Sequence, residues 1–195
     1  CIDFYQAMKA EGLKPIIGCE AYVCQNRREK GNFSREYSHL ILLCENNTGY
    51  QNLMHLISEG FLTGYYYRPR IDYDLIRKHH EGLIALSACL GGPIPQFLLS
   101  DDYDAARDYA LKLAQIFGED HFYLELQDHG IDEQRPVNQG IMRLARETGL
   151  HLVVTNDAHY LRKEDAEMQD VLLCIQTGKT VDEENRMKFQ TDEFY

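Results

Sequence analysis

The chain has no long apolar run. Among its 195 residues, no apolar run approaches the roughly 20 residues that span a bilayer. The opening CIDFYQAMKAEGLK has neither the basic start nor the apolar centre of a signal peptide. We therefore expect no membrane association.

The sequence also lacks paired cysteine motifs. Its six cysteines, at positions 1, 19, 24, 44, 89 and 174, include no C-x-x-C pair, and several lie within apolar, strand-like runs. A disulfide framework is typical of smaller secreted chains. We therefore expect reduced thiols in a cytoplasmic protein.

Positive charge is scarce. The chain has 20 Lys and Arg against 31 Asp and Glu, for a net charge of −11. Affinity for phosphate comes mainly from Lys and Arg, so this balance argues against a surface that binds nucleic acid by itself. It does not exclude phosphate chemistry at a metal ion, because acidic ligands collect divalent cations.

What the chain does contain is enough for one domain with a sizeable core. Hydrophobic residues make up 44% and charged residues 26%, an ordinary globular balance. The first residue is not Met, and we expect the chain to be a piece of a longer protein.

Strand-like and helix-like segments alternate along the sequence, which predicts a parallel sheet with helices outside it. Functional sites in such folds collect at the carboxyl ends of the strands. The expected strands span residues 14–23, 38–45, 83–89, 122–127 and 151–155. The expected helices span residues 1–12, 47–61, 74–80, 102–117, 136–148 and 164–178, and residues 25–37 and 64–72 are expected to be loops.

Polar side chains of the kind that bind metals stand beside four of these strands. In TNDAHY, Asp157 and His159 are two residues apart after an apolar strand and so would project to the same side. Glu20 lies near the end of its strand and Cys89 ends another. His39 begins its strand, and therefore fits this arrangement less cleanly. Carboxylate, imidazole and thiolate together are competent metal ligands.

Each of these residues has an ordinary explanation when taken alone. Glu20 can be an exposed carboxylate and His39 a hydrogen-bonded structural histidine. Cys89 can be a small buried hydrophobe, and Asp157 can cap a turn. The interpretation as a metal site depends on all five residues occurring together beside the strands.

Several segments resemble one family throughout the chain. The matching stretches are KPIIGCEAYV, SHLILLCENNTGYQNLMHLIS, LIALSACLGG, LVVTNDAHYL and VLLCIQTGKTVDEENRMKF. They are similar to the PHP domains (polymerase and histidinol phosphatase) of bacterial replicative DNA polymerase III alpha subunits. The resemblance implies an α/β fold, a distorted seven-stranded (β/α)7 PHP barrel of TIM-like type. It also implies that a His-x-His strand and an Asp-His-Gly segment lie upstream, so that residues 1–178 form a partial PHP domain and residues 179–195 an exit linker toward the polymerase palm domain.

The resemblance assigns roles to the candidate residues. It implies that Glu20, His39, Cys89, Asp157 and His159 are metal ligands, with Asp157 and His159 catalytic. The mixed oxygen, nitrogen and sulfur donors favour zinc or manganese. The implied chemistry is metal-dependent phosphoester hydrolysis, with a 3′→5′ proofreading exonuclease as one form of it.

For the parent protein, the resemblance implies a DNA-directed DNA polymerase whose magnesium-dependent palm lies outside this chain. Its implied partners are the rest of the alpha subunit, DNA, a proofreading exonuclease subunit and the sliding clamp. Two alternatives stay open. The domain can be a non-catalytic scaffold that stabilises the polymerase and docks an exonuclease subunit, or a free-standing PHP phosphatase.

Two further motifs stand out. Asp128-His129-Gly130 has the same spelling as the absent upstream segment but follows a later strand, and we expect His129 at the rim of the cleft, facing substrate. Residues 65–70, YYYRPR, interleave aromatic and cationic residues as single-strand binders do. The acidity of the chain favours the simpler interpretation, in which these tyrosines pack on the barrel or on a neighbouring domain.

Overall fold

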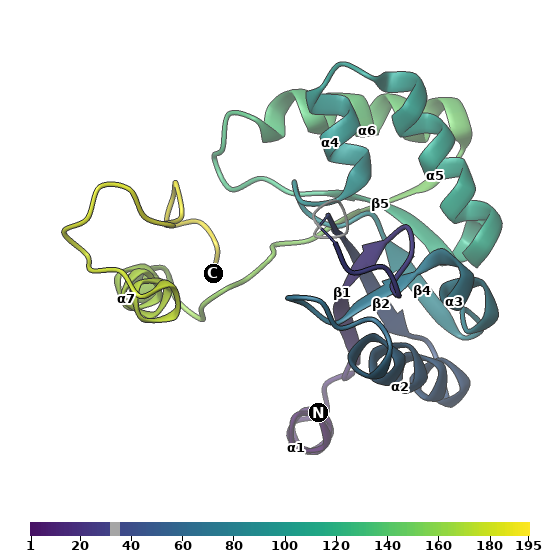
Figure 1. The fold of residues 1–195 in the computed structure, drawn as a ribbon, viewed down its shortest axis with the longest axis horizontal. Helices are drawn as coiled ribbons and strands as arrows, with labels where there is room; N and C mark the ends of the chain where they lie inside the picture. Colours follow the sequence, from purple (N-terminus) through teal and green to yellow (C-terminus); the bar gives the residue numbers. More distant parts are fainter. Residues whose placement is uncertain (32–35) are drawn as a thin grey trace.

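The computed structural model describes residues 1–31 and 36–195, and this part of the chain is built on one open, six-stranded sheet (Figure 1). The strand order is β3-β1-β2-β4-β5-β6, so β3 and β6 form the two edges. The mixed α/β arrangement is consistent with the expected TIM-like PHP barrel, with a sheet that is not closed. The strands are β1 (Gly18–Cys24), β2 (Ser38–Cys44), β3 (Arg70–Asp72), β4 (Leu83–Leu86), β5 (Phe122–Leu126) and β6 (His151–Val154).

The prediction of an all-parallel sheet is wrong for one strand. β2 pairs antiparallel with both β1 and β4, whereas β1–β3, β4–β5 and β5–β6 are parallel. No helix lies in the described part of the connection from β1 to β2, and a parallel neighbour would need a crossover of a dozen or more residues. The expected loop over residues 25–37 includes positions 32–35, which lie outside the described residues.

The helices largely follow the apolar periodicity of the sequence. Asn46 caps α2 by accepting a hydrogen bond from the Gly49 amide, so this helix begins at Asn47. The sequence did not indicate β3 or the short helix α4. The helices are α1 (Ile2–Ala10), α2 (Asn47–Leu62), α3 (Tyr73–Lys78), α4 (Pro93–Leu99), α5 (Tyr103–Phe117), α6 (Gln134–Thr148) and α7 (Ala166–Thr177), with 3₁₀ turns at Glu119–His121 and Lys163–Asp165.

One face of the sheet carries the hydrophobic core. Alternate residues of β1 and β2, including Ala21, Val23, Leu40 and Leu42, are at most 3% exposed and belong to the same core as residues of α2, α5 and α6. The residues between them point to the opposite face, because side chains alternate along a strand. That second face is only half-buried at positions such as Ile41.

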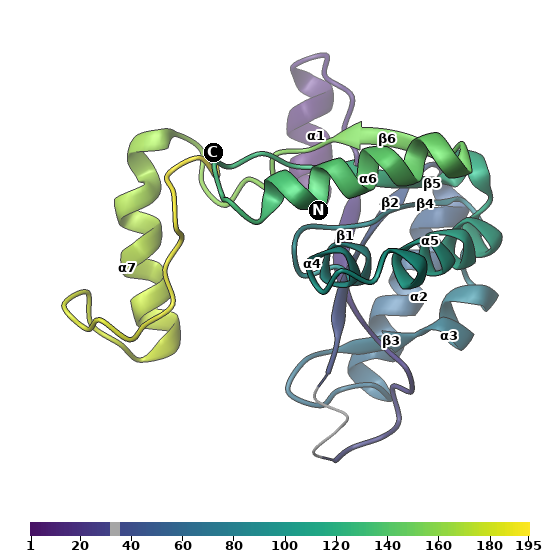
Figure 2. The same ribbon diagram turned by 90° about the horizontal axis from the view of Figure 1, so that it is seen from above.

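The C-terminal segment lies to one side of the sheet-containing body. Figures 1 and 2 show α7 and the tail after it set apart from the helices that pack on the sheet. The tail returns toward the end of β6, where Phe194 stacks on the His129 ring at a centroid distance of 4.1 Å. Within the described ranges, no helix has the length and apolar character needed to cross a membrane.

Candidate metal centre

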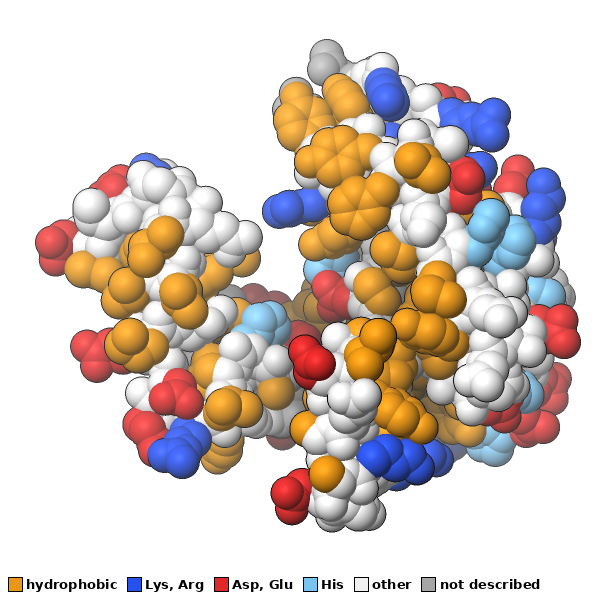
Figure 3. Space-filling model, turned by 90° about the horizontal axis from the view of Figure 1, so that it is seen from below, with side chains coloured by type: hydrophobic (Ala, Val, Ile, Leu, Met, Phe, Trp, Pro, Cys, Tyr) orange, Lys and Arg blue, Asp and Glu red, His pale blue; other side chains and the backbone are white. Residues whose placement is uncertain are grey.

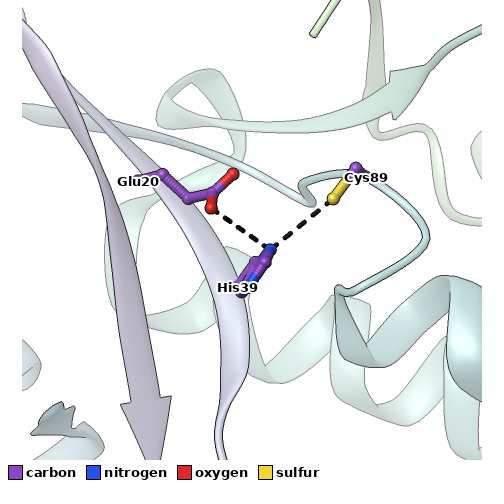
Figure 4. Close-up of side chains that lie close together, drawn as sticks. All are labelled: Glu20, His39 and Cys89. Atoms are coloured by element: carbon purple, nitrogen blue, oxygen red, sulfur yellow. Dashed lines mark hydrogen bonds and ion pairs between the residues drawn. The ribbon is translucent and has the colours of Figure 1, made fainter. Parts of the chain in front are cut away.

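Three of the five predicted ligands come together beside the half-buried face of the sheet. His39 Nδ1 lies 3.2 Å from Glu20 Oε1 and 3.6 Å from Cys89 Sγ. The three donor atoms all lie within 4.8 Å of one another. Figure 4 shows the carboxylate and the sulfur directed at the same edge of the imidazole ring. Among the described residues, these three side chains form the candidate metal group.

The reversed direction of β2 explains how His39 joins this group. Glu20 pairs with Ile41, two residues from His39, so both side chains project from the same face of the β1–β2 ladder. Ile41 also pairs with Leu86, the last residue of β4. The amino end of β2 therefore lies beside the carboxyl end of β4, from which the chain continues to Cys89.

Cys89 is held on a turn and not on a strand. β4 ends at Leu86, three residues earlier than the sequence predicts, and Ala88 has φ 67, a left-handed conformation unusual for a residue with a side chain. The same turn brings Gly91 against the imidazole, where a Cβ would lie 2.9 Å from His39 Nδ1. The Gly91 carbonyl also accepts a hydrogen bond from the His39 amide. This turn therefore places the sulfur and leaves space around the imidazole.

Two of the three spacings between the donor atoms are close to those around a bound metal ion. Around a tetrahedral zinc ion with bonds of about 2.0–2.3 Å, neighbouring ligand atoms are separated by roughly 3.3–3.8 Å. The observed contacts of 3.2 and 3.6 Å are close to that range. One carboxylate, one imidazole and one thiol suit zinc better than calcium or magnesium, which prefer oxygen ligands alone.

The electrostatics of Cys89 also favour a cation. Burial raises the pKa of the Cys89 thiol to about 11, and the negative charges of Asp157 and Glu20 raise it further, while hydrogen bonding to the Gly91 backbone opposes the shift. Without a cation the thiol is therefore neutral at physiological pH. A metal ion would offset both carboxylates and replace the thiol proton.

Asp157 lies near this group without belonging to it. Its charge raises the pKa of both Cys89 and Glu125. Its backbone has φ 42, which is a second left-handed position beside the candidate centre. Such conformations recur at functional sites, where the surrounding structure holds them.

His159 is directed toward the tail. Its ring packs against Phe189 at 4.7 Å and Phe194 at 5.6 Å between centroids, and its Nδ1 lies 2.7 Å from the Asp157 carbonyl oxygen. The His159 amide donates to the Phe194 carbonyl. The structure thus groups Glu20, His39 and Cys89, keeps Asp157 within electrostatic range, and leaves His159 outside the group.

Glu125 is a polar residue near the centre that the sequence analysis missed. It is 4% exposed, and its Oε2 has no hydrogen-bond partner among the described residues. Its other oxygen accepts hydrogen bonds from Thr155 and Gln127. Burial raises the pKa of this carboxyl, and nearby Asp157 adds to the shift. The sequence does contain a signal, because Glu125 lies between the apolar residues Leu124 and Leu126 in β5, a strand with neighbours on both sides.

The expectation that His129 faces substrate at a cleft rim is wrong. The residue is 1% exposed. Its Nε2 lies 2.7 Å from the Asn156 carbonyl oxygen, and its Nδ1 lies 2.7 Å from the Gln134 amide nitrogen. These partners indicate a ring that donates from Nε2 and accepts at Nδ1. His129 therefore links the segment that follows β6 to the start of α6.

Comparisons with known proteins agree on one family. Residues 1–129 match the PHP domain. The chain is 47% identical over 197 residues to the DNA polymerase III subunit alpha of Treponema pallidum, 49% over 199 residues to that of Thermus aquaticus and 46% over 197 residues to that of Borreliella burgdorferi. Each match covers 100% of this chain but only 16–17% of the relative, so the chain spans about a sixth of the length of these curated relatives.

Proposed function

This chain belongs to the PHP domain family, and on that premise we propose that it is the PHP domain of a DNA polymerase III alpha subunit, with a metal-dependent phosphodiesterase site. The observation that carries the proposal is the convergence of Glu20, His39 and Cys89 on one point. The similarity to three polymerase alpha subunits supports the parent assignment.

The proposed site holds zinc or manganese through Glu20, His39 and Cys89, with Asp157 and His159 as further ligands and catalytic groups. A bound divalent ion supplies a water of lowered pKa and stabilises charge on the phosphoryl oxygens. The protein's own contribution is to place these side chains and to keep negative charge beside the pocket. His159 would have to leave its contacts with Phe189 and Phe194 to take part.

The finer form of the proposal is a 3′→5′ exonuclease that proofreads for the polymerase. In that setting the magnesium-dependent nucleotidyl transfer belongs to a palm domain outside this chain. The partners are the rest of the alpha subunit, DNA, a proofreading exonuclease subunit and the sliding clamp, and the proposed location is the cytoplasm.

The test uses the natural protein that carries this chain. Glu20→Gln and Cys89→Ser remove metal ligands with little change in shape, and Glu45→Gln and Cys44→Ser are matched controls away from the candidate group. We expect the first pair to lower zinc or manganese affinity at least about tenfold and to abolish hydrolysis of single-stranded DNA. Wild-type metal content and hydrolysis in Glu20→Gln and Cys89→Ser would refute the proposed site.

A second candidate is the scaffold role, and two observations favour it. His159 is engaged by the tail, and α7 exposes Met168, Leu172 and Ile175 at 64%, 58% and 72%, an apolar surface suited to contact with other parts of a large protein. In this case the ligand variants would lower the thermal midpoint of the protein, while wild type would bind metal and hydrolyse nothing.

A further inference from the structure

An aromatic cluster adjoins the candidate metal ligand His39. The ring centroids of Tyr22 and His39 are 5.6 Å apart, and Tyr37 stacks nearly parallel to His39 at 6.2 Å and 11°. Tyr22 and Tyr37 meet edge to face at 4.7 Å. The Arg68 guanidinium lies 5.8 Å from the centre of the Tyr22 ring. An arginine and two tyrosines therefore form a connected surface that ends at the metal group.

This surface is open to solvent. Tyr37 is 38% exposed, and Arg68 is exposed at the far end of the cluster. Two of the YYYRPR tyrosines, Tyr65 and Tyr67, are 52% and 60% exposed in this chain, and their packing on a neighbouring domain stays a prediction. Figure 3 shows hydrophobic side chains gathered in a long run on one face of the larger part of the molecule, with Lys and Arg side chains near both of its ends.

The local charge differs from that of the whole chain. Residues 61–70, FLTGYYYRPR, contain two arginines and no acidic residue, whereas the chain as a whole carries −11. Arg70 is fully buried, so Arg68 supplies the exposed positive charge of this stretch. Arg68 is hydrogen-bonded to Tyr37, which raises the pKa of its guanidinium, and lies 5.8 Å from the centre of the Tyr22 ring. Positive charge beside exposed aromatic rings complements a ligand that carries both phosphates and flat apolar groups.

We propose that Tyr22, Tyr37 and Arg68 form a platform for the terminal bases of single-stranded nucleic acid and deliver the adjoining phosphodiester to the Glu20–His39–Cys89 group. This inference rests on the proposed function and names the substrate form that its site accepts. Tyr37 stacks with an unpaired base and Arg68 contacts the backbone phosphate. A base in a duplex has both faces covered by its neighbours, so the platform selects single strands.

Photocrosslinking tests the platform without requiring hydrolysis. The natural protein that carries this chain is mixed, in chelator, with single-stranded DNA bearing 5-iododeoxyuridine at the 3′ end, irradiated and digested for peptide mapping. We expect crosslinks at Tyr22 or Tyr37, and a yield about tenfold lower for Tyr37→Ala and Arg68→Ala. Tyr37→Phe keeps the stacking ring and retains most of the yield.

Tyr103→Ala is the matched control. Tyr103 also pairs with an arginine, Arg143, at 3.8 Å from the ring centre, but on α5 and α6 and with no candidate ligand in that contact. Its replacement is expected to leave the crosslink yield unchanged. Thermal melting of every variant separates a lost platform from a lost fold.

The outcomes separate the platform from the hydrolytic site. Crosslinks at Tyr37 in a protein that hydrolyses nothing would support the platform and refute the phosphodiesterase. Metal-dependent hydrolysis of bis(p-nitrophenyl) phosphate, with crosslinks mapping elsewhere or undiminished in Tyr37→Ala and Arg68→Ala, would refute the platform alone.

Discussion

One face of the sheet forms the hydrophobic core, and the other carries the candidate functional residues. On β2, Leu40 and Leu42 point into the helix-covered core and are at most 2% exposed, whereas His39 and Ile41 point to the other face and stay half-buried. The candidate metal ligands and the aromatic cluster belong to that second face. A single strand with a period of two thus separates residues that stabilise the fold from residues available for chemistry.

The largest expected effect comes from replacing neighbouring residues of β2 that point to opposite faces. We expect Leu42→Ala to lower the free energy of unfolding by about 2–5 kcal/mol, because it leaves a cavity in a fully buried site. Ile41→Ala removes a half-buried side chain and is expected to cost about 1 kcal/mol. Urea denaturation measures both. Equal losses would mean that the two faces contribute alike to stability.

A smaller effect, on metal affinity, tests the role of the second face of the sheet. In Gly91→Ala the new Cβ would lie 2.9 Å from His39 Nδ1, so the imidazole has to rotate from its present position. We expect metal affinity to fall about 10- to 100-fold with the ligands themselves unchanged. Competition with a fluorescent chelator measures the affinity.

Gly60→Ala is the control for that substitution, because its nearest contact outside its own helix would be an ordinary 3.4 Å. Its metal affinity is expected to equal that of wild type. An unchanged affinity in Gly91→Ala as well would show that the imidazole position in this structure does not determine metal binding.

The smallest predicted effect concerns Glu125. Burial raises the pKa of this carboxyl above its ordinary 4.5, so the folded state binds its proton more readily than the unfolded state does. Stability is therefore lost as pH rises through 4.5 toward the raised value. Glu125→Gln cannot ionise, and in chelator its advantage in thermal midpoint over wild type should be larger at pH 8 than at pH 4. A constant difference across this range would exclude ionisation of Glu125 as the cause.

The sequence predicted most of the elements but not how the strands pair. Apolar periodicity located α2, α5 and α6, because each helix buries one face regardless of its partners. The direction of β2 depends on pairing with β1 and β4, which lie elsewhere in the sequence. The direction of β2 also explains the position of His39. This residue fitted least well as a strand-end ligand, yet its imidazole contacts both Glu20 and Cys89.

The details of the site were less predictable for a similar reason. The left-handed backbone at Ala88 is imposed by surrounding structure, since alanine does not favour it, whereas aspartate at position 157 tolerates it better. The contact of His159 with Phe194 joins positions 35 residues apart through a tail that carries no periodic signal. Residue types alone indicate a metal site, whereas the positions of its members depend on turns and long-range contacts.

The antiparallel pairing of β1 with β2 has a consequence for the order of assembly. These two strands are close in the chain and can meet early during folding, because closing a short loop costs little entropy. Cys89, by contrast, is 50 residues from His39 and depends on β4 docking against β2. We therefore expect Glu20 and His39 to be in place first, so that a metal ion present during synthesis could be held by two ligands before the third arrives.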